Sequence, residues 1–321
     1  MAESTTSAAP LLALEDVSRR FLVRRGWFGE PQQLTAVAGV SLGLRRGESL
    51  GLVGESGCGK STLGRLACGL LTPSEGRVLL EGRELPPASA ASWAAGRIQM
   101  VFQDPFSSLN PRLSVRASVA EPLAARDMPR AERRRLADEM LATVGLEGMG
   151  GRYPHEFCRR PAPAHRRGPC PDHQAGRGHL RRAGFGPGRF GAGAGAQPAV
   201  RCAGAFQPVL SFISHDLAVV GFICPRILVM YLGQVVEEAP RERLFAGAAH
   251  PYSQALLAAM PTGDGESRLP RILEGELPSP LNPPAGCRFH PRCPKAVDIC
   301  RREPPAWKEL APGWRARCHL L

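Results

Sequence analysis

The chain has 321 residues, enough for one large domain or for a domain with an appendage. Its 43% hydrophobic and 22% charged residues are typical of a globular protein and not of a fibrous or disordered one. The N-terminus has no basic start before an apolar run, and no apolar window could span a bilayer. We therefore expect a cytosolic or peripheral protein whose ten cysteines are thiols or metal ligands.

The formal charge of +12 would by itself indicate an anionic partner, such as a nucleotide, a nucleic acid or a membrane surface. One segment, from Cys158 to Arg201, carries most of this charge. It contains nine arginines, no lysine and one acid, Asp172, so it accounts for eight of the twelve net charges. The rest of the chain has only a mild positive excess, which requires no such partner.

The N-terminal part of the chain alternates short apolar runs with turn residues. Strands are expected over 11–23 and 35–44. "SLGLVG" (49–54) predicts a strand that runs into glycines. A helix is expected to begin at Lys60, with an apolar face made of Leu63, Leu66, Ala67 and Leu70. A strand and turn over 74–85 and a strand over 98–103 are expected next.

In the second half of the chain, a predicted helical region is followed by the arginine-rich segment and then by further predicted strands. A helical region is expected over 114–146, with an apolar face made of Leu136, Met140, Leu141 and Val144. After the arginine-rich segment, residues 209–220 predict a strand followed by a helix, and residues 226–239 predict a strand pair around Gly233. A Pro-rich tail with clustered cysteines follows from about His250.

The stretch "GESGCGKST" fits the phosphate-loop pattern G-x-x-x-x-G-K-[ST]. Its glycines let backbone N–H groups point at phosphate oxygens, and the positive end of the following helix adds to this. Lys60 can reach the β- and γ-phosphates, and the Ser61 hydroxyl can bind Mg²⁺. A strand precedes the motif and a helix follows it, which argues against a Gly-rich turn without function. The expected nucleotide-binding residues are Gly54, Glu55, Ser56, Gly57, Cys58, Gly59, Lys60, Ser61 and Thr62.

Further stretches, in the same order, make the chain resemble the ATP-binding subunits of ABC transporters, in the oligopeptide/dipeptide importer branch. "VFQDPFSSLNPR" resembles the family's Q-loop, which implies that Gln103 senses Mg²⁺ and couples to the membrane partner. "FISHDL" resembles the switch region, which implies that His215 reaches the γ-phosphate. Phe21 stands where the family has an aromatic that stacks on adenine, and a plain core phenylalanine is the alternative. The match is completed by "RYPHEF", "HPYSQALLAAMP" and "GCRFHPRCPKAVDICRREPP".

The resemblance implies an α/β fold with a P-loop NTPase core of the ABC ATPase type, an antiparallel β subdomain, a helical subdomain and a C-terminal extension. It implies a nucleotide-binding domain over 1–250 and a transporter-specific C-terminal region over 251–321. The implied cofactors are ATP and Mg²⁺, and the implied activity is ATP hydrolysis coupled to peptide import at the cytoplasmic face of the membrane. The implied partners are permease subunits, a second ATPase subunit (the same chain or a paralogue) and, through the permeases, an external peptide-binding protein. No nucleic acid is expected.

The arginine-rich segment lacks two elements that the family needs. The family has an SGGQ signature after "PHEF", and later a strand that ends in Asp-Glu-Pro, whose Glu polarises the attacking water. Here Arg181 and Arg182 stand where that Asp and that catalytic Glu are expected. Gly and Pro also cannot fill a buried strand. We therefore expect the centre of the fold to be disrupted and hydrolysis to fail.

The segment has the length that the family requires but different residues, which indicates a shifted reading frame over 158–209. If bases two and three of each codon are joined to base one of the next, residues 159–171 can read GGQRQRIGVARAL. In the same frame, residues 181–189 can read DEPVSALDV. The Gly-Gly-Gln of the signature and the Asp-Glu-Pro motif thus appear where they are expected, so we interpret the segment as an out-of-frame translation between two compensating shifts.

Two other interpretations of the chain stay open. The segment could be an Arg/Gly element that binds nucleic acid, although Phe185 and Phe190 are the only Phe, Tyr or Trp residues between Cys158 and Arg201. The chain could also be a remnant that binds ATP without hydrolysing it.

The C-terminal tail contains four cysteines: Cys287, Cys293, Cys300 and Cys318. Four thiolates on a Pro-rich tail with little core suggest a metal site. The family resemblance adds that some relatives with this tail are thought to hold a [4Fe–4S] cluster. Four reduced thiols in a docked tail are the alternative.

Overall fold

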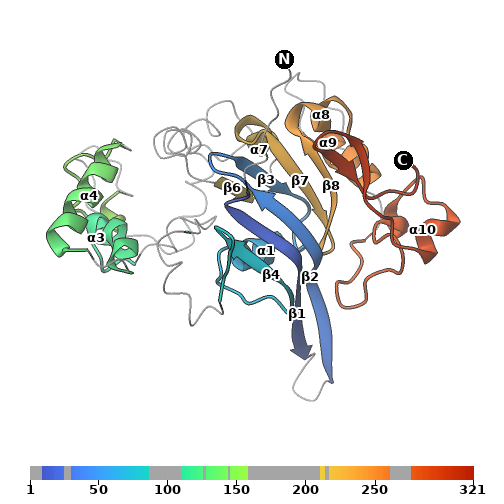
Figure 1. Cartoon of the computed structure of the whole chain (residues 1–321), viewed down its shortest axis with the longest axis horizontal. Helices are drawn as coiled ribbons and strands as arrows, with labels where there is room; N and C mark the ends of the chain where they lie inside the picture. The colour runs from blue at the N-terminus through green and yellow to red at the C-terminus, as the bar shows by residue number, and fades with distance from the viewer. Residues whose placement is uncertain are drawn as a thin grey trace, which may run out of the picture. The chain divides into compact units, whose positions relative to one another are not determined.

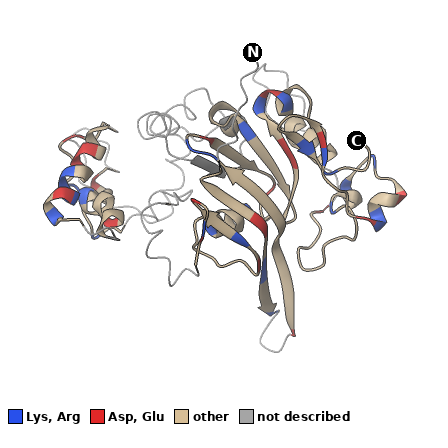
Figure 2. Cartoon of the chain, viewed as in Figure 1, with Lys and Arg blue, Asp and Glu red and all other residues tan. Residues whose placement is uncertain are grey.

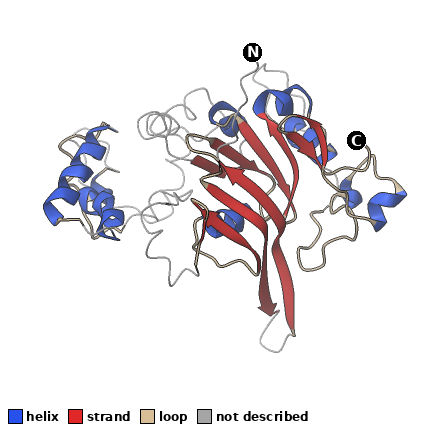
Figure 3. Ribbon diagram, viewed as in Figure 1, coloured by secondary structure: helices blue, strands red, loops and turns tan. Residues whose placement is uncertain are grey.

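The computed structural model describes residues 9–24, 30–86, 98, 110–125, 128–143, 145–157, 210–213, 217–260 and 276–321. The chain divides into two compact units. One consists of Met1–Ala88 and Cys202–Leu321, and the other of Ser89–Arg201. The ten described strands belong to the first unit, and the second carries the helices α3 and α4 (Figure 1, Figure 3).

Four strands of the first unit form an antiparallel sheet in the order β2-β1-β4-β5. Their bounds are β1 Leu12–Arg24, β2 Pro31–Leu44, β4 Glu75–Leu80 and β5 Arg83–Glu84. Leu12 pairs with Leu44 of β2 and with Leu80 of β4, and all three side chains are buried. This sheet is the predicted antiparallel β subdomain. Strand β2 begins earlier than predicted, because residues 31–34 pair with residues 21–24 of β1. Pro31 is compatible with this position because it is the first residue of the strand.

Among the described residues, the second sheet has six strands in the order β6-β3-β7-β8-β10-β9. β3 (Ser49–Val53) is parallel to β6 (Leu210–Ile213) on one side and to β7 (Arg226–Tyr231) on the other. β7 forms the hairpin predicted around Gly233 with β8 (Gln234–Pro240). Both hairpin strands are buried over nearly their whole length, which is the pattern of strands covered on both faces of a sheet.

The C-terminal residues extend this second sheet. β10 (Trp314–Ala316) pairs antiparallel with β8, and β9 (Lys308–Ala311) pairs with β10. The Glu237 carboxylate of β8, which is fully buried, accepts hydrogen bonds from Trp314 Nε1 at 2.9 Å and from the backbone N–H groups of Ala249 and His250. The C-terminal region is therefore part of the same folded unit as the central strands.

In the described part of the first unit, five α-helices have the bounds α1 Lys60–Ala67, α7 Leu217–Ile223, α8 Arg241–Gly247, α9 Pro251–Ala258 and α10 Asp298–Arg302. α7 packs closely on β3. A Cβ at Gly51 would lie 2.1 Å from Val220 of α7, so only glycine permits this approach.

The helix predicted from Lys60 is shorter than its apolar pattern suggested. Leu63 and Leu66 are buried as predicted, but Leu70 lies beyond the end of α1 and is 51% exposed. The helix ends because Gly69 adopts a φ of +70°, after which the N–H of Leu70 donates to the carbonyl of Arg65. The prediction for Leu70 was therefore wrong.

The second unit contains α3 (Val115–Ala120), the 3-10 turn η2 (Glu121–Ala125), α4 (Arg130–Thr143) and the 3-10 turn η3 (Pro154–Glu156). α4 carries both basic and acidic side chains (Figure 2), and Arg116 of α3 pairs with Asp138 of α4 at 2.5 Å. The helical region predicted over 114–146 is interrupted, because Pro129 fits before a helix and not inside one.

The buried face of α4 differs from the prediction. It is formed by Ala137 and Leu141, four residues apart, whereas Met140 is 48% exposed. Met140 was thus wrongly assigned to the buried face, and Leu136 is half-buried. Val144 lies outside the described residues. Across the described parts of both units, no helix is long and apolar enough to cross a membrane.

Candidate functional site

The predicted phosphate loop connects the end of β3 to the start of α1. Gly54, Gly57 and Gly59 have φ values of +151°, +81° and +107°, a region that favours glycine. A Cβ at Gly54 would lie 2.2 Å from the carbonyl oxygen of Met230, and one at Gly59 would lie 2.2 Å from that of Ala36. The glycines are therefore required both by backbone conformation and by close packing on the neighbouring strands.

The loop is also held by backbone hydrogen bonds. The N–H of Gly233, in the turn between β7 and β8, donates to the carbonyl of Cys58 at 2.8 Å. Within the loop, the N–H of Cys58 donates to the carbonyl of Glu55 at 3.3 Å, and Leu63 N–H donates to Gly59 at 2.9 Å. These bonds connect the loop to the β7–β8 hairpin and to the first turn of α1.

Lys60 lies folded into the loop and is 8% exposed. Its Nζ donates to the carbonyl oxygens of Gly54 and Glu55, both at 2.7 Å, and lies 3.5 Å from Cys58 Sγ. An ammonium group surrounded by loop carbonyls can transfer one of these hydrogen bonds to a phosphate oxygen that enters the loop. Ser56, Gly57 and Ser61 are exposed, and Thr62 is half-buried in α1. The structure thus brings the nine predicted loop residues together around Lys60.

Cys58 is a packed residue of the loop, with 1% of its surface exposed. Burial raises the pKa of its thiol, and the nearby Lys60 offsets this only in part. The thiol is therefore neutral at pH 7, and its contribution is to fill space beneath the loop.

Two residues far along the chain contact the loop, and no motif in the sequence assigned them a role. The Tyr252 hydroxyl accepts a hydrogen bond from the Glu55 N–H at 2.8 Å. The Arg292 guanidinium donates two hydrogen bonds to the Glu55 carboxylate, at 2.7 and 3.0 Å. The only signal in the sequence was Glu55 itself, an acid in a predicted anion-binding loop. Such an acid indicates that a cation lies nearby, but the sequence does not indicate which residue provides it.

The Arg292–Glu55 pair differs in burial from the ion pairs on the surface. Arg292 is 5% exposed and Glu55 26%, whereas Arg77 and Glu15 are both about half exposed. Exposed pairs contribute about 0–1 kcal/mol, but removing one partner of a buried pair costs about 3–5 kcal/mol. The pairing with Glu55 also raises the pKa of Arg292.

An aromatic cluster lies behind these contacts. Tyr231 is 4.6 Å from Tyr252 and 5.3 Å from Phe289, measured between ring centroids, and all three are buried. The Arg292 guanidinium carbon lies 6.0 Å from the centre of the Tyr231 ring. The cluster therefore joins β7, α9 and the C-terminal region at the base of the loop.

The remaining predicted nucleotide-site residues are not tested by the geometry. Phe21 is half-buried in β1, where the Arg19 guanidinium carbon lies 4.8 Å from its ring centre. Gln103, His215, Arg182 and the whole segment 158–209 lie outside the described residues. Their predicted roles stay predictions.

The four tail cysteines are free thiols, of which Cys300 is buried and the other three are half-buried. The N–H of Cys287 donates to the carbonyl of Cys300 at 2.8 Å. Burial raises the pKa of Cys287 to about 11, and the charges of Cys300, Cys318 and Cys293 add to this effect. Among the described residues, however, no three His, Cys, Asp or Glu side chains are placed to hold a metal ion.

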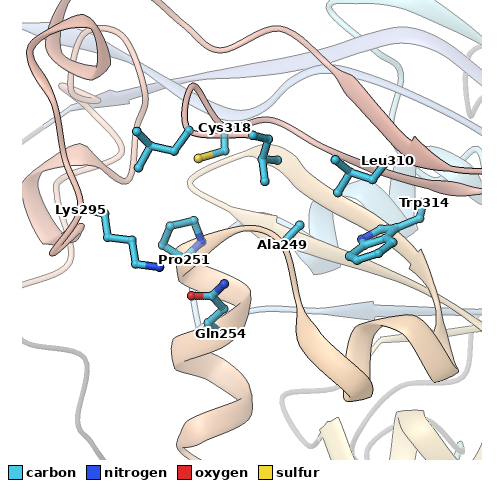
Figure 4. A pocket seen from close by; sticks show the side chains of 9 residues that line it. Ala249, Pro251, Gln254, Lys295, Leu310, Trp314 and Cys318 are labelled. Atoms are coloured by element: carbon cyan, nitrogen blue, oxygen red, sulfur yellow. The ribbon is translucent and has the colours of Figure 1, made fainter.

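A cavity of about 430 Å³ lies away from the phosphate loop (Figure 4). Its walls come from α9 and from the C-terminal residues: Ala249, Pro251, Gln254, Lys295, Leu310, Trp314, Cys318, Leu320 and Leu321. No loop residue lines it, so we do not assign it to the nucleotide site.

Comparison with known proteins identifies two matching families. The family described as ABC transporter matches residues 37–160, and the family described as oligopeptide/dipeptide transporter, C-terminal region, matches residues 236–300.

Individual relatives match almost the whole chain. The probable peptide ABC transporter ATP-binding protein y4tS of Sinorhizobium fredii is 42% identical, with 97% of this chain and 90% of the relative covered. The oligopeptide transport ATP-binding protein AppF of Bacillus subtilis is 40% identical, with 97% of each covered. OppF of Escherichia coli, also an oligopeptide transport ATP-binding protein, is 39% identical, with 92% of each covered.

Solved structures support the fold. CbiO1 of Clostridium perfringens, part of an ABC transporter complex, matches with a TM-score of 0.55 at 23% identity, covering 74% of this chain and 91% of that one. The ATP-binding cassette MJ0796, solved as a dimer with ADP and phosphate, matches with a TM-score of 0.53 at 22% identity, covering 72% and 98%. The α/β P-loop core predicted from the sequence is confirmed.

The pH dependence of stability should report on His250, which caps α9 and so positions Tyr252. Burial lowers the pKa of His250 to about 4, and its Nδ1 accepts the N–H of Tyr252 at 3.0 Å. Between pH 4 and the ordinary value of 6.5, the unfolded chain binds a proton that the folded chain does not, so the free energy of unfolding should fall as the pH falls through this window. Urea midpoints measured across the window test this.

His250→Asn should flatten that dependence, because the Asn oxygen can accept the same N–H without titrating. The exposed His155, changed to Asn, is the matched control and should leave the slope unchanged. An equal slope in His250→Asn and in the unmodified chain would contradict the assignment.

Proposed function

Because the chain belongs to the ATP-binding proteins of ABC transporters, we propose that it is the ATP-binding subunit of an importer of oligopeptides or dipeptides. The family's activity is ATP hydrolysis coupled to transport. The peptide substrate is supported by the names of the relatives and by the match of residues 236–300 to the oligopeptide/dipeptide transporter region.

The observation that carries the ATP-binding role is the geometry of the phosphate loop. Its glycines, the buried Lys60 and the exposed Ser61 provide the parts that a triphosphate with Mg²⁺ requires. In this proposal Lys60 binds the β- and γ-phosphates, and Ser61 and Gln103 hold Mg²⁺. Phe21 stacks on adenine, and His215 contacts the γ-phosphate.

The proposed partners follow from the family. ABC ATPases act with membrane permease subunits and as dimers, and the MJ0796 cassette was solved as a dimer. We propose that this chain pairs with itself or with a paralogue. It would bind permease subunits at the cytoplasmic face of the membrane, where an external binding protein delivers the peptide. A nucleotide-binding domain over 1–250 and a C-terminal region over 251–321 fit this division of roles.

The reading-frame shift over 158–209 is supported by where the family match stops. The match to the ABC transporter family ends at residue 160, close to the predicted start of the shift. The nucleotide sequence of codons 155–215 tests the shift directly. The shifted codons should spell the Gly-Gly-Gln of the signature and the Asp-Glu-Pro motif, and codons that spell neither would exclude the proposal.

The chain as written should bind ATP weakly and not hydrolyse it, because Arg181 and Arg182 replace two carboxylates that the metal and the attacking water need. A version with 158–209 restored to the family frame should both bind and hydrolyse ATP. Calorimetric ATP binding and phosphate release on both proteins measure this.

Lys60→Ala is the matched variant for the binding step. It removes a charge-assisted contact to the phosphates and should weaken ATP binding about 10- to 100-fold. ATP binding that is unaffected by Lys60→Ala would contradict the proposed site, and hydrolysis by the chain as written would contradict the role given to the missing carboxylates.

We also propose that the four tail cysteines hold a [4Fe–4S] cluster. This is supported by the hydrogen bond from Cys287 N–H to the carbonyl of Cys300 and by the effect of the charges of Cys293, Cys300 and Cys318 on the pKa of Cys287, since cysteine thiolates are the usual ligands of such clusters. The bound group would supply a structural staple for the tail. Iron and acid-labile sulfide should co-purify anaerobically with the chain and be lost in Cys300→Ser. Iron-free protein of unchanged thermal stability would contradict this.

A further inference from the structure

The phosphate loop contains a negative charge that does not help it to bind ATP. Glu55 follows the first glycine of the loop, and Lys60 donates to its backbone carbonyl and not to its carboxylate. A free carboxylate within the loop would repel a triphosphate, since like charges a few ångströms apart interact unfavourably. The loop therefore needs a cation that neutralises Glu55.

Arg292 provides that cation from the C-terminal region. It is the last residue of the 3-10 turn η4 (His290–Arg292). Its two terminal nitrogens donate to the two oxygens of Glu55, at 2.7 and 3.0 Å, in the bidentate geometry that arginine favours. The guanidinium is almost fully buried, so solvent screens the pair little on the arginine side.

The same region fixes Glu55 at a second point. Tyr252 of α9 accepts the backbone N–H of Glu55 at 2.8 Å, and Tyr252 packs on Tyr231 and on Phe289, which lies three residues before Arg292. Both the backbone and the carboxylate of Glu55 are thus held by residues that follow the nucleotide-binding core in the chain.

We propose that Arg292 is a positioning residue for ATP binding: it neutralises Glu55 and holds the phosphate loop open to the triphosphate. The C-terminal region that matches oligopeptide/dipeptide transporters then sets the nucleotide affinity of the core. This inference rests on the proposed ATP-binding function of the loop.

The test is equilibrium binding of ATP and ADP to the full chain and to three variants. Arg292→Met leaves Glu55 uncompensated and should weaken ATP binding about tenfold, and ADP binding less, because ADP carries less charge. The double variant Arg292→Met/Glu55→Gln removes the repulsion and should recover most of the ATP affinity. Arg292→Lys keeps the charge but loses the bidentate geometry and should lie between Arg292→Met and the unmodified chain.

Arg315→Met is the matched control. Arg315 also lies in the C-terminal region and pairs with a carboxylate, Glu238, at 2.7 Å, but that pair does not touch the loop. Glu238 keeps Arg226 as a second partner in this variant, so ATP affinity should not change. Thermal unfolding of every variant shows whether it folds. If Arg292→Met does not fold, ATP binding by Arg292→Lys is the measurement that decides.

The outcomes separate the two proposals. If the unmodified chain binds no ATP, the proposed function fails and this inference fails with it. If the chain binds ATP but neither Arg292→Met nor Arg292→Lys weakens binding, the inference alone is wrong. If Arg292→Met weakens ATP binding and the added Glu55→Gln does not restore it, Arg292 has only a structural role and the inference is also wrong.

Discussion

The close contact between the phosphate loop and the β7–β8 hairpin is the constraint on which the rest of the site depends. Gly54 lies against the Met230 carbonyl, and Gly233 donates its N–H to Cys58. No larger residue fits at Gly54 or Gly59, so the path of the loop is determined by strands on which it packs. The hairpin strands are buried over nearly their whole length, and Lys60 is held inside the loop by the carbonyls of Gly54 and Glu55.

The C-terminal region belongs to the same structural unit as this support. β10 adds to the sheet beside β8, Glu237 binds Trp314, and Phe289 packs on Tyr231. Through Tyr252 and Arg292 these contacts extend to Glu55 of the loop. The part of the chain that matches the oligopeptide/dipeptide transporter C-terminal region is therefore connected to the predicted phosphate loop by direct hydrogen bonds.

The sequence predicted the parts of the site that depend on local pattern. The strand before the loop, the helix from Lys60 and the hairpin around Gly233 follow from apolar periodicity and from glycines at turns. The errors at Leu70 and Met140 arose because periodicity gives the angle of a residue on a helix, but not where the helix ends or how wide its buried face is. Arg292 and Tyr252 could not be found, because a contact between residues more than 190 positions apart leaves no local pattern.

A crystal structure of the chain with a non-hydrolysable ATP analogue and Mg²⁺ would show whether the loop is shaped for the triphosphate and is held in that shape by the C-terminal region. Lys60 Nζ should leave the carbonyls of Gly54 and Glu55 for phosphate oxygens. The Arg292–Glu55 pair and the bond from Glu55 N–H to Tyr252 should remain. A nucleotide bound away from residues 54–62, or Glu55 turned away from Arg292 in the complex, would contradict the account.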